Sequence, residues 1–474
     1  MAENLTNERL ASLLTEAGWT PRGLARALNG AFGDGTVSAT APYFWRDRCA
    51  VPHAPLPALV AHVLSARLGR EVTAAEIWDR RVQESPHLQL ASAGMNRPWS
   101  IQGTRVVAED WLIGGLVDRR DFLAVSGNTL AKAVSAYLGG DLAAAAAPHA
   151  KEQGDLLISQ IEAGIPHLQQ LDDAKGGAAG LGYVGAQLRA VALVLREGTY
   201  NAAETRRLLV ALADISQLAG WMAFDAARHG LAQRYFFTSL RAAHDAGYAA
   251  MAAHILADLS YQAATRGYAS DGVALGEAAF RLAARSLAGV RASVRSRLAY
   301  AYASAGLFGE FERAHRESVD ILAGRDAAAD PAWLYYLTVN HLECQAGYSL
   351  VLAGRQVQAD GDRAGRAMLR RGAALLRTGA HRLPHDDDTA QRRALYEGAW
   401  LSLAYTACGD LESACAEARI AIGRLGSVRS PRSNMLLRQL SAELRRRARN
   451  PHVSDLLPDL KRALAMQATA HGNS

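Results

Sequence analysis

Cysteines, lysines and long apolar runs are all scarce in this chain of 474 residues. The four cysteines are scattered and form no Cys-x-x-Cys pair, which argues against a disulfide scaffold and a zinc ribbon and fits a reducing cytoplasm. No apolar run reaches the roughly 18 residues of a membrane span, and no charged-then-apolar segment opens the sequence. We therefore expect a cytoplasmic protein that has neither a membrane span nor a signal peptide.

Signatures of catalysis are missing as well. None of the lysines lies in a G-x-x-x-x-G-K-[ST] loop, so a P-loop nucleotide site is not expected. His341 and Cys344 are three residues apart and could share a helix face, but two ligands do not make a zinc site. We assign the chain no catalytic role, no cofactor and no metal.

The hydrophobic pattern is helical almost throughout. Alanine-rich segments of helical period are broken by glycine and polar turns, and strand signals are nearly absent. The period fades between residues 83 and 127, where prolines and glycines interrupt it. We expect an all-α protein with a helical bundle over residues 1–82, a linker or connecting segment over 83–127, and a helical-repeat domain over 128–474.

Glycines spaced at regular intervals indicate that the repeats are helix pairs. Gly230, Gly267 and Gly306 are 37 and 39 residues apart, close to the period of helix-turn-helix repeats. We expect further turns at Gly354 and Gly409, with longer helices or an inserted loop between them.

The clearest single repeat runs from Ala399 to Ala421. Leu401, Ser402 and Tyr405 precede the expected turn at Gly409, and small alanines follow it at helical spacing. Small residues let paired helices approach closely while larger side chains fill the groove between pairs. The unit resembles a tetratricopeptide repeat, which implies an α-solenoid with a concave inner surface.

Two helix signals stand near the start of the chain. Thr20 can cap a helix that begins at Pro21, where the missing N–H costs nothing. After a glycine-containing turn over residues 29–36, Ser38 can cap a second helix, which we expect to run until Pro52 stops it. Trp45, eight residues after Val37, is expected to face inward.

This arrangement resembles the phage-repressor type of helix-turn-helix. The resemblance covers residues 5–78 and includes two closing helices, over residues 56–70 and 72–78, as in large actinobacterial regulators of the Streptomyces type. In those regulators a tetratricopeptide-like array follows the helix-turn-helix domain. The resemblance implies a DNA-binding transcriptional regulator of differentiation or secondary metabolism.

Positive charge is concentrated where this motif meets DNA. The segment from Thr20 to Arg70 holds six arginines against two aspartates, although the whole chain carries a net charge of only +6. In the helix-turn-helix the start of the second helix reads base edges, whereas arginines and the first helix's N-terminus contact phosphates. The expected DNA-binding residues are Thr20, Arg22, Ser38, Ala39, Thr40, Tyr43, Arg46 and Arg48.

A ligand surface is expected on the inner helices of the repeats. Tyrosine and tryptophan can supply apolar contact there, while asparagine and arginine hold polar groups of a peptide or small molecule. Trp333, Tyr335, Tyr336 and Asn340 are expected on one helix. The candidate ligand-binding residues are Tyr261, Arg297, Tyr300, Trp333, Tyr336 and Asn340. The arginine-rich segment over residues 429–449 is expected to form a solvated final helix.

The sequence thus predicts a regulator that binds double-stranded DNA as a homodimer and senses a small molecule or peptide through its helical repeats. A tetratricopeptide-like scaffold that binds protein partners, without direct DNA binding, is the alternative. In that case the N-terminal bundle would serve only as a docking module.

Overall fold

The computed structural model describes residues 6–32, 36–53, 56–68, 70, 72–78, 97–113, 127–138, 153–359, 364–381 and 390–472. Over these ranges every regular element is a helix and no strand forms. The predicted all-α fold class is therefore confirmed.

The chain divides into two compact units, each interrupted once in the sequence. The first comprises residues 1–96 and 115–140, and the second comprises residues 97–114 and 141–474. This division differs from the expected ranges 1–82, 83–127 and 128–474. Most of the described part of the expected linker is helical. Helix α6 (Ile101–Ala108) and the π-helix η2 (Glu109–Ile113) pack on α11 (His229–Asp245) and α9 (Gly177–Glu197) of the second unit.

Six helices form the described part of the first unit. They are α1 (Glu8–Glu16), α2 (Pro21–Phe32), α3 (Ala41–Asp47), α4 (Leu56–Leu68), α5 (Ala74–Trp78) and α7 (Gly127–Leu138). Leucines of α1, α2 and α4 make a common core with Trp45 and Trp78, whose rings meet edge to face. The expected inward position of Trp45 is confirmed, since only 5 % of it is exposed.

The first helix of the helix-turn-helix begins as predicted and continues further than predicted. The hydroxyl of Thr20 accepts a hydrogen bond from the N–H of Gly23, and Pro21 is the first helical residue. The helix then runs to Phe32, so the expected turn starts later than residue 29. Asn29 is consequently on the helix, where its side chain accepts the N–H of Val37 at 2.9 Å and donates to the carbonyl of Val37 at 3.0 Å. We call this pair of hydrogen bonds the Asn29 clamp.

The second helix is shorter than predicted at both ends. Helix α3 begins at Ala41, and its N-cap is Thr40 rather than Ser38. The hydroxyl of Ser38 nevertheless accepts the N–H of Ala41, at 3.2 Å, in the turn before the helix. The helix ends at Asp47, well before Pro52, because the chain turns into a left-handed conformation at Cys49.

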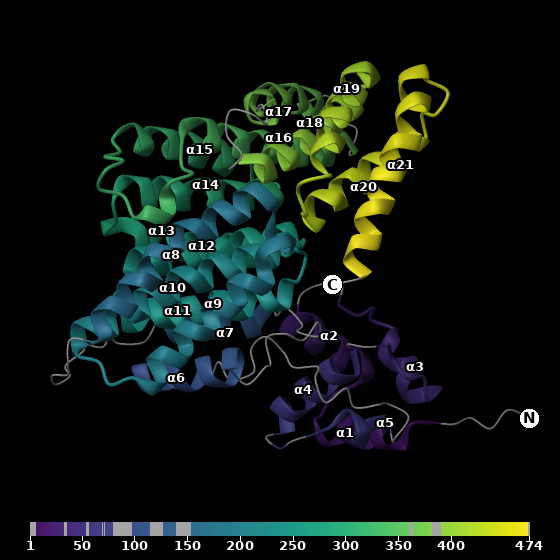
Figure 1. The fold of residues 1–474 in the computed structure, drawn as a ribbon. Helices are drawn as coiled ribbons and strands as arrows, with labels where there is room; N and C mark the ends of the chain where they lie inside the picture. The colour runs from purple at the N-terminus through teal and green to yellow at the C-terminus, as the bar shows by residue number, and fades with distance from the viewer. Residues whose placement is uncertain are drawn as a thin grey trace, which may run out of the picture. The chain divides into compact units, whose positions relative to one another are not determined.

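The second unit is an array of packed helix pairs (Figure 1). Two helices, α8 (Gln153–Lys175) and α9 (Gly177–Glu197), precede five pairs, and α20 (Pro431–Arg445) and α21 (Pro451–Gly472) follow them. The pairs are α10 (Ala202–Asp225) with α11 (His229–Asp245), α12 (Ala249–Thr265) with α13 (Ala269–Leu282), α14 (Ala288–Ser304) with α15 (Phe308–Ala323), α16 (Val339–Ala359) with α17 (Ala364–Ala380), and α18 (Gln391–Cys408) with α19 (Leu411–Arg424). The predicted solenoid-like succession of helix pairs is therefore present.

Glycines end the first helices of several pairs. Gly267, Gly306 and Gly409 adopt the left-handed backbone conformation that glycine accepts without strain, as predicted for turns. Gly230 is not such a turn, since it lies within α11. The equivalent left-handed position between α10 and α11 is Ala227, at φ +59°.

Close backbone contact explains a different group of glycines, between α16 and α17. Gly354 is within α16 rather than at a turn, and its backbone meets that of Gly365. About two helical turns further along the interface, a Cβ on Gly372 would lie 2.7 Å from the carbonyl oxygen of Gly347. These two helices therefore approach more closely than any side chain at these positions would allow.

The predicted repeat over residues 399–421 is confirmed as α18, a Gly409 turn and α19. Asp410 caps α19 by accepting the N–H of Ser413. The small residues expected on the packing face, Ala414 and Ala418, are fully buried.

In the part of the chain that the structure describes, two helices, α9 and α10, are long and apolar enough to cross a membrane by length and composition alone. Within the protein, 44 % of the apolar window of α9 and 78 % of that of α10 is buried. None of the four cysteines, all of which the structure describes, forms a disulfide.

Replacing Gly372 with alanine is expected to destabilise the protein by about 1–3 kcal/mol, because the new methyl group has no room beside Gly347. The matched control is Gly423→Ala on α19, where a Cβ would meet nothing within 4 Å. That change is expected to stabilise the helix by up to about 1 kcal/mol. Thermal unfolding of both variants checks this, and equal shifts would contradict the close approach of α16 and α17.

Candidate functional site

The expected DNA-binding residues lie on the surface of the first unit. Arg46 is partly buried, and the others are exposed. Three of them, Ser38, Ala39 and Thr40, stand in the turn before α3 instead of on the helix itself. Arg48 is the C-cap of α3, one residue beyond its last turn.

Two arginines lie over aromatic rings of α3. The guanidinium of Arg48 lies 4.9 Å from the ring centre of Phe44, and that of Arg46 lies 5.5 Å from the ring centre of Tyr43. Arg46 also pairs with the neighbouring Asp47 at 2.5 Å, so part of its charge is already neutralised. Among the described residues no carboxylate pairs with Arg48 or with Arg22. These two arginines are the freer cations of the predicted surface.

Sequence reasoning missed Phe44 as a surface residue. Its side chain is 44 % exposed, although the next residue, Trp45, is buried in the core. The helical period could have predicted this exposure. Consecutive side chains of a helix point about 100° apart, so a helix that buries Trp45 turns Phe44 outward.

A cavity opens among the first helices of the five pairs in the second unit. Its empty volume is about 850 Å³, counting the part that is open to solvent. Each of the five helices contributes to it, and α8 and α20 close its wall. One lining residue from each of these first helices, in chain order, is Trp221, Tyr261, Arg297, Tyr348 and Tyr396.

The structure brings four of the six predicted ligand-binding residues to this cavity. Tyr261, Arg297, Trp333 and Tyr336 line it. Tyr300 is buried behind the lining, with its ring 4.5 Å from that of Tyr261. Asn340 does not line the cavity, and its side chain lies beside Cys344.

The expected single helix that carries Trp333, Tyr336 and Asn340 does not exist. Trp333 is in the short 3-10 helix η5 (Ala332–Leu334), Tyr336 is in the turn after it, and Asn340 is on α16. A change of direction before α16 thus points Trp333 and Tyr336 into the cavity and Asn340 away from it.

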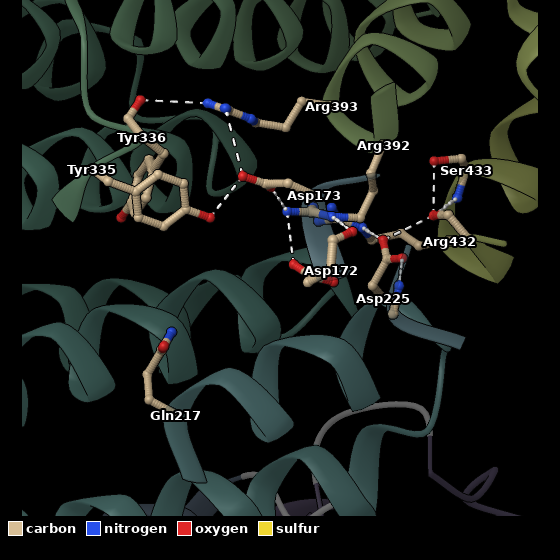
Figure 2. A network of polar contacts seen from close by, with 12 residues as sticks. Asp172, Asp173, Gln217, Asp225, Tyr335, Tyr336, Arg392, Arg393, Arg432 and Ser433 are labelled. Atoms are coloured by element: carbon tan, nitrogen blue, oxygen red, sulfur yellow. Dashed lines mark hydrogen bonds and ion pairs between the residues drawn. The ribbon is translucent and has the colours of Figure 1, made fainter. Parts of the chain in front are cut away.

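Buried ion pairs join α8 to α18 at one side of the cavity (Figure 2). The guanidinium of Arg392 lies 3.0 Å from a carboxylate oxygen of Asp172 and 2.9 Å from one of Asp173. Asp173 also accepts a hydrogen bond from the hydroxyl of Tyr335 at 2.6 Å and pairs with Arg393 at 3.8 Å. We call these five residues the ion network.

A second buried pair joins α10 to α20. Asp225 at the end of α10 accepts hydrogen bonds from the hydroxyl of Ser430 at 2.8 Å and from Arg432 at 3.3 Å. The Arg432 guanidinium lies 4.2 Å from the ring centre of Tyr396. The expectation of a solvated final helix over residues 429–449 is therefore wrong at Arg432, which lines the cavity, and α21 follows as a further helix.

The opposite side of the cavity is built around Asp258 on α12. Arg297 forms an ion pair with this carboxylate, and Gln217 donates a hydrogen bond to it at 2.9 Å. His254, one turn earlier, stacks on Trp333 with ring centres 4.4 Å apart. Burial, with the nearby charge of Arg297, lowers the pKa of His254 well below its usual value, so the imidazole is neutral.

None of the side chains in the described ranges forms a group of three or more His, Cys, Asp or Glu residues that could hold a metal ion. The cavity therefore offers ion pairs, amides and aromatic faces for binding.

Comparison with known proteins bears on the first unit alone. The family model of the SP15 N-terminal domain matches residues 10–77, which span α1 to α5. None of the curated proteins matches the chain. The matched domain is thus the part that carries the helix-turn-helix pattern, and its name assigns no activity.

The free energy of unfolding is expected to depend on pH through the titration of Asp172 in the ion network. Burial raises the pKa of Asp172 to about 7, against the lowering effect of Arg392. Between pH of about 4 and 7, Asp172 is then protonated in the folded protein but ionised in the unfolded chain. The contribution of this carboxyl group to the free energy of unfolding therefore falls as pH rises through this interval, and it is constant above pH of about 7.

Denaturant unfolding of the wild type and of Asp172→Asn at several pH values across this interval measures the effect. The difference between the two curves is expected to grow with pH and then become constant. Parallel curves would show that Asp172 titrates as an ordinary carboxyl group.

Proposed function

We propose that this protein is a cytoplasmic, sequence-specific DNA-binding regulator of transcription, with a helical-repeat domain that senses a ligand. The observation that carries the proposal is the surface around α3. A short helix, positioned by the Asn29 clamp, exposes Tyr43, Phe44 and Arg48, while Arg22 stands exposed in the first turn of α2.

This surface offers separate groups for the phosphate contacts and the base contacts of DNA recognition. Arginines contact phosphates and set the register of the protein on the duplex, whereas base edges are read by the groups at the start of the second helix. Arg22 and Arg48 have the free charge for the first task, and the exposed turn with Ser38, Ala39 and Thr40 offers small polar groups for the second.

The cavity of the second unit supports the sensing role. Ligand sites are concave, mostly apolar and supplied with a few converging polar groups. The space lined by Trp221, Tyr261, Tyr348 and Arg297 has these properties. Because its walls come from all five helix pairs, a bound molecule contacts every repeat at once and can favour one arrangement of the array over another.

A protein-binding scaffold is the alternative, and the exposed Phe44 also fits it, since an exposed aromatic ring can dock on a partner. DNA binding separates the two proposals, because phosphate contacts make affinity fall steeply with salt and apolar docking does not.

Arg22→Ala and Arg48→Ala are each expected to weaken binding to genomic DNA fragments and to reduce the slope of log K against log salt concentration by about one. The physical reason is the loss of one phosphate contact and of the counterion release that accompanies it. Electrophoretic mobility shifts over a range of salt concentrations measure both quantities.

The matched control is Arg70→Ala, which removes the same charge from the first unit. The guanidinium of Arg70 already pairs with Glu16 and Glu76, both at 3.1 Å, so its loss is expected to leave the salt slope unchanged. If all three variants bind DNA as the wild type does, the surface around α3 is not a DNA interface.

Specific binding is expected to require a homodimer on an inverted repeat, because one domain of this kind covers only a half-site. Light scattering of the free protein and of its complex with DNA measures the mass. A monomer in both states would reject the two-fold arrangement.

A further inference from the structure

We propose that the cavity of the second unit binds a planar aromatic molecule of zero net charge that carries hydrogen-bonding groups at its edge. The inference deepens the ligand-sensing part of the proposed function and is independent of DNA binding. It depends on how the charges, rings and polar atoms of the wall are arranged (Figure 2).

The cations of the wall are already paired with carboxylates of the protein. Every guanidinium that lines the cavity has a carboxylate partner within the protein: Arg392 has Asp172 and Asp173, Arg393 has Asp173, Arg432 has Asp225 and Arg297 has Asp258. A ligand with a net charge would have to displace one of these partners and leave a carboxylate or guanidinium buried without compensation, which is costly. This balance favours a neutral or zwitterionic molecule over a phosphate, a polyamine or another strongly charged ligand.

The rings of the wall favour a flat molecule. Trp221, Tyr336 and Tyr348 line the cavity together with Trp333. The guanidinium of Arg297 already lies 5.1 Å from the ring centre of Trp221, which shows that flat polarisable groups stack on this wall. Both ring faces and guanidinium planes gain most from stacking on another flat, polarisable group. An aliphatic chain of the same volume would gain less from these surfaces.

Amide side chains in the wall favour hydrogen-bonding groups on the ligand. Gln169, Gln217 and Gln345 line the cavity, and each amide can both donate and accept hydrogen bonds. A ligand with donors and acceptors at its edge can bond to these amides while its ring meets the aromatic side chains.

Size sets the last limit. The empty volume of about 850 Å³, part of which is open to solvent, lies within the roughly 300–1,000 Å³ of small-molecule sites. A molecule with one or two fused rings and a short polar side chain fits this space, whereas a folded peptide does not.

Four probes with a common ring and different charge test the proposal: free L-tryptophan as a zwitterion, indole-3-acetamide as a neutral molecule, indole-3-acetate as an anion and tryptamine as a cation. Isothermal titration calorimetry with the full chain measures each dissociation constant. The two probes of zero net charge are expected to bind about tenfold more tightly than either charged probe, a difference of roughly 1.4 kcal/mol.

Variants tie the binding to the cavity. Tyr336→Ala removes a lining ring that is only half buried, and it is expected to weaken the better probe about tenfold. Asn340→Ala, a few residues away but outside the cavity, and Tyr183→Ala, an exposed tyrosine of α9, are the matched controls and are expected to bind as the wild type does.

Arg393→Gln gives a readout that loss of folding cannot imitate. Removing one cation leaves the wall with an excess of negative charge, so tryptamine is expected to bind more tightly than it does to the wild type while indole-3-acetate binds more weakly.

Tighter binding of a charged probe to the wild type would overturn the proposal, and so would the absence of binding by all four probes at millimolar concentration. Equal loss in Tyr336→Ala and Asn340→Ala would also overturn it, because the binding would then lie elsewhere. Calorimetry with these probes needs no DNA, so a failure here is distinguishable from a failure of DNA binding, which the mobility shifts measure separately.

Discussion

The buried ion pairs between Arg392 and the two aspartates of α8 are the interaction on which the second unit depends. They connect side chains separated by 220 and 219 positions in the sequence. Close to them along the chain, the N–H of Arg429 donates a hydrogen bond to the carbonyl of Lys175 at 2.8 Å. A buried ion pair adds little net stability, since desolvation offsets most of the attraction, but it strongly disfavours any arrangement that leaves one partner alone. The pairs therefore fix which helices meet across the array, and with that the existence of the cavity.

Much of the fold followed from local patterns. The Thr20 cap, the Gly267 and Gly409 turns and the inward face of Trp45 each depend on a few consecutive residues, and the structure confirms all of them. The errors arose where a distant partner decides the outcome. Asn29 looked like a turn residue, but its side chain is satisfied by Val37, which allows α2 to continue past it.

The aromatic members of the cavity and Arg297 were predictable from the sequence, whereas Arg432 and Asp172 were not. Tyr261 and Trp333 are large apolar side chains, and sequence alone indicates that such residues are buried. Arg432 and Asp172 look like surface residues in sequence, because burial of either depends on an opposite charge contributed by another part of the chain. No local sequence pattern identifies that partner. Because Arg432 lies in an arginine-rich segment, the sequence favoured a solvent-exposed position for it.

The Asn29 clamp couples the placement of α3 to that of α2. Its two hydrogen bonds hold Val37 directly against α2, just before the turn that leads into α3. A single side chain on α2 thus passes the position of that helix on to the start of α3. Any movement of α2 within its bundle is therefore expected to move the exposed surface of α3 with it.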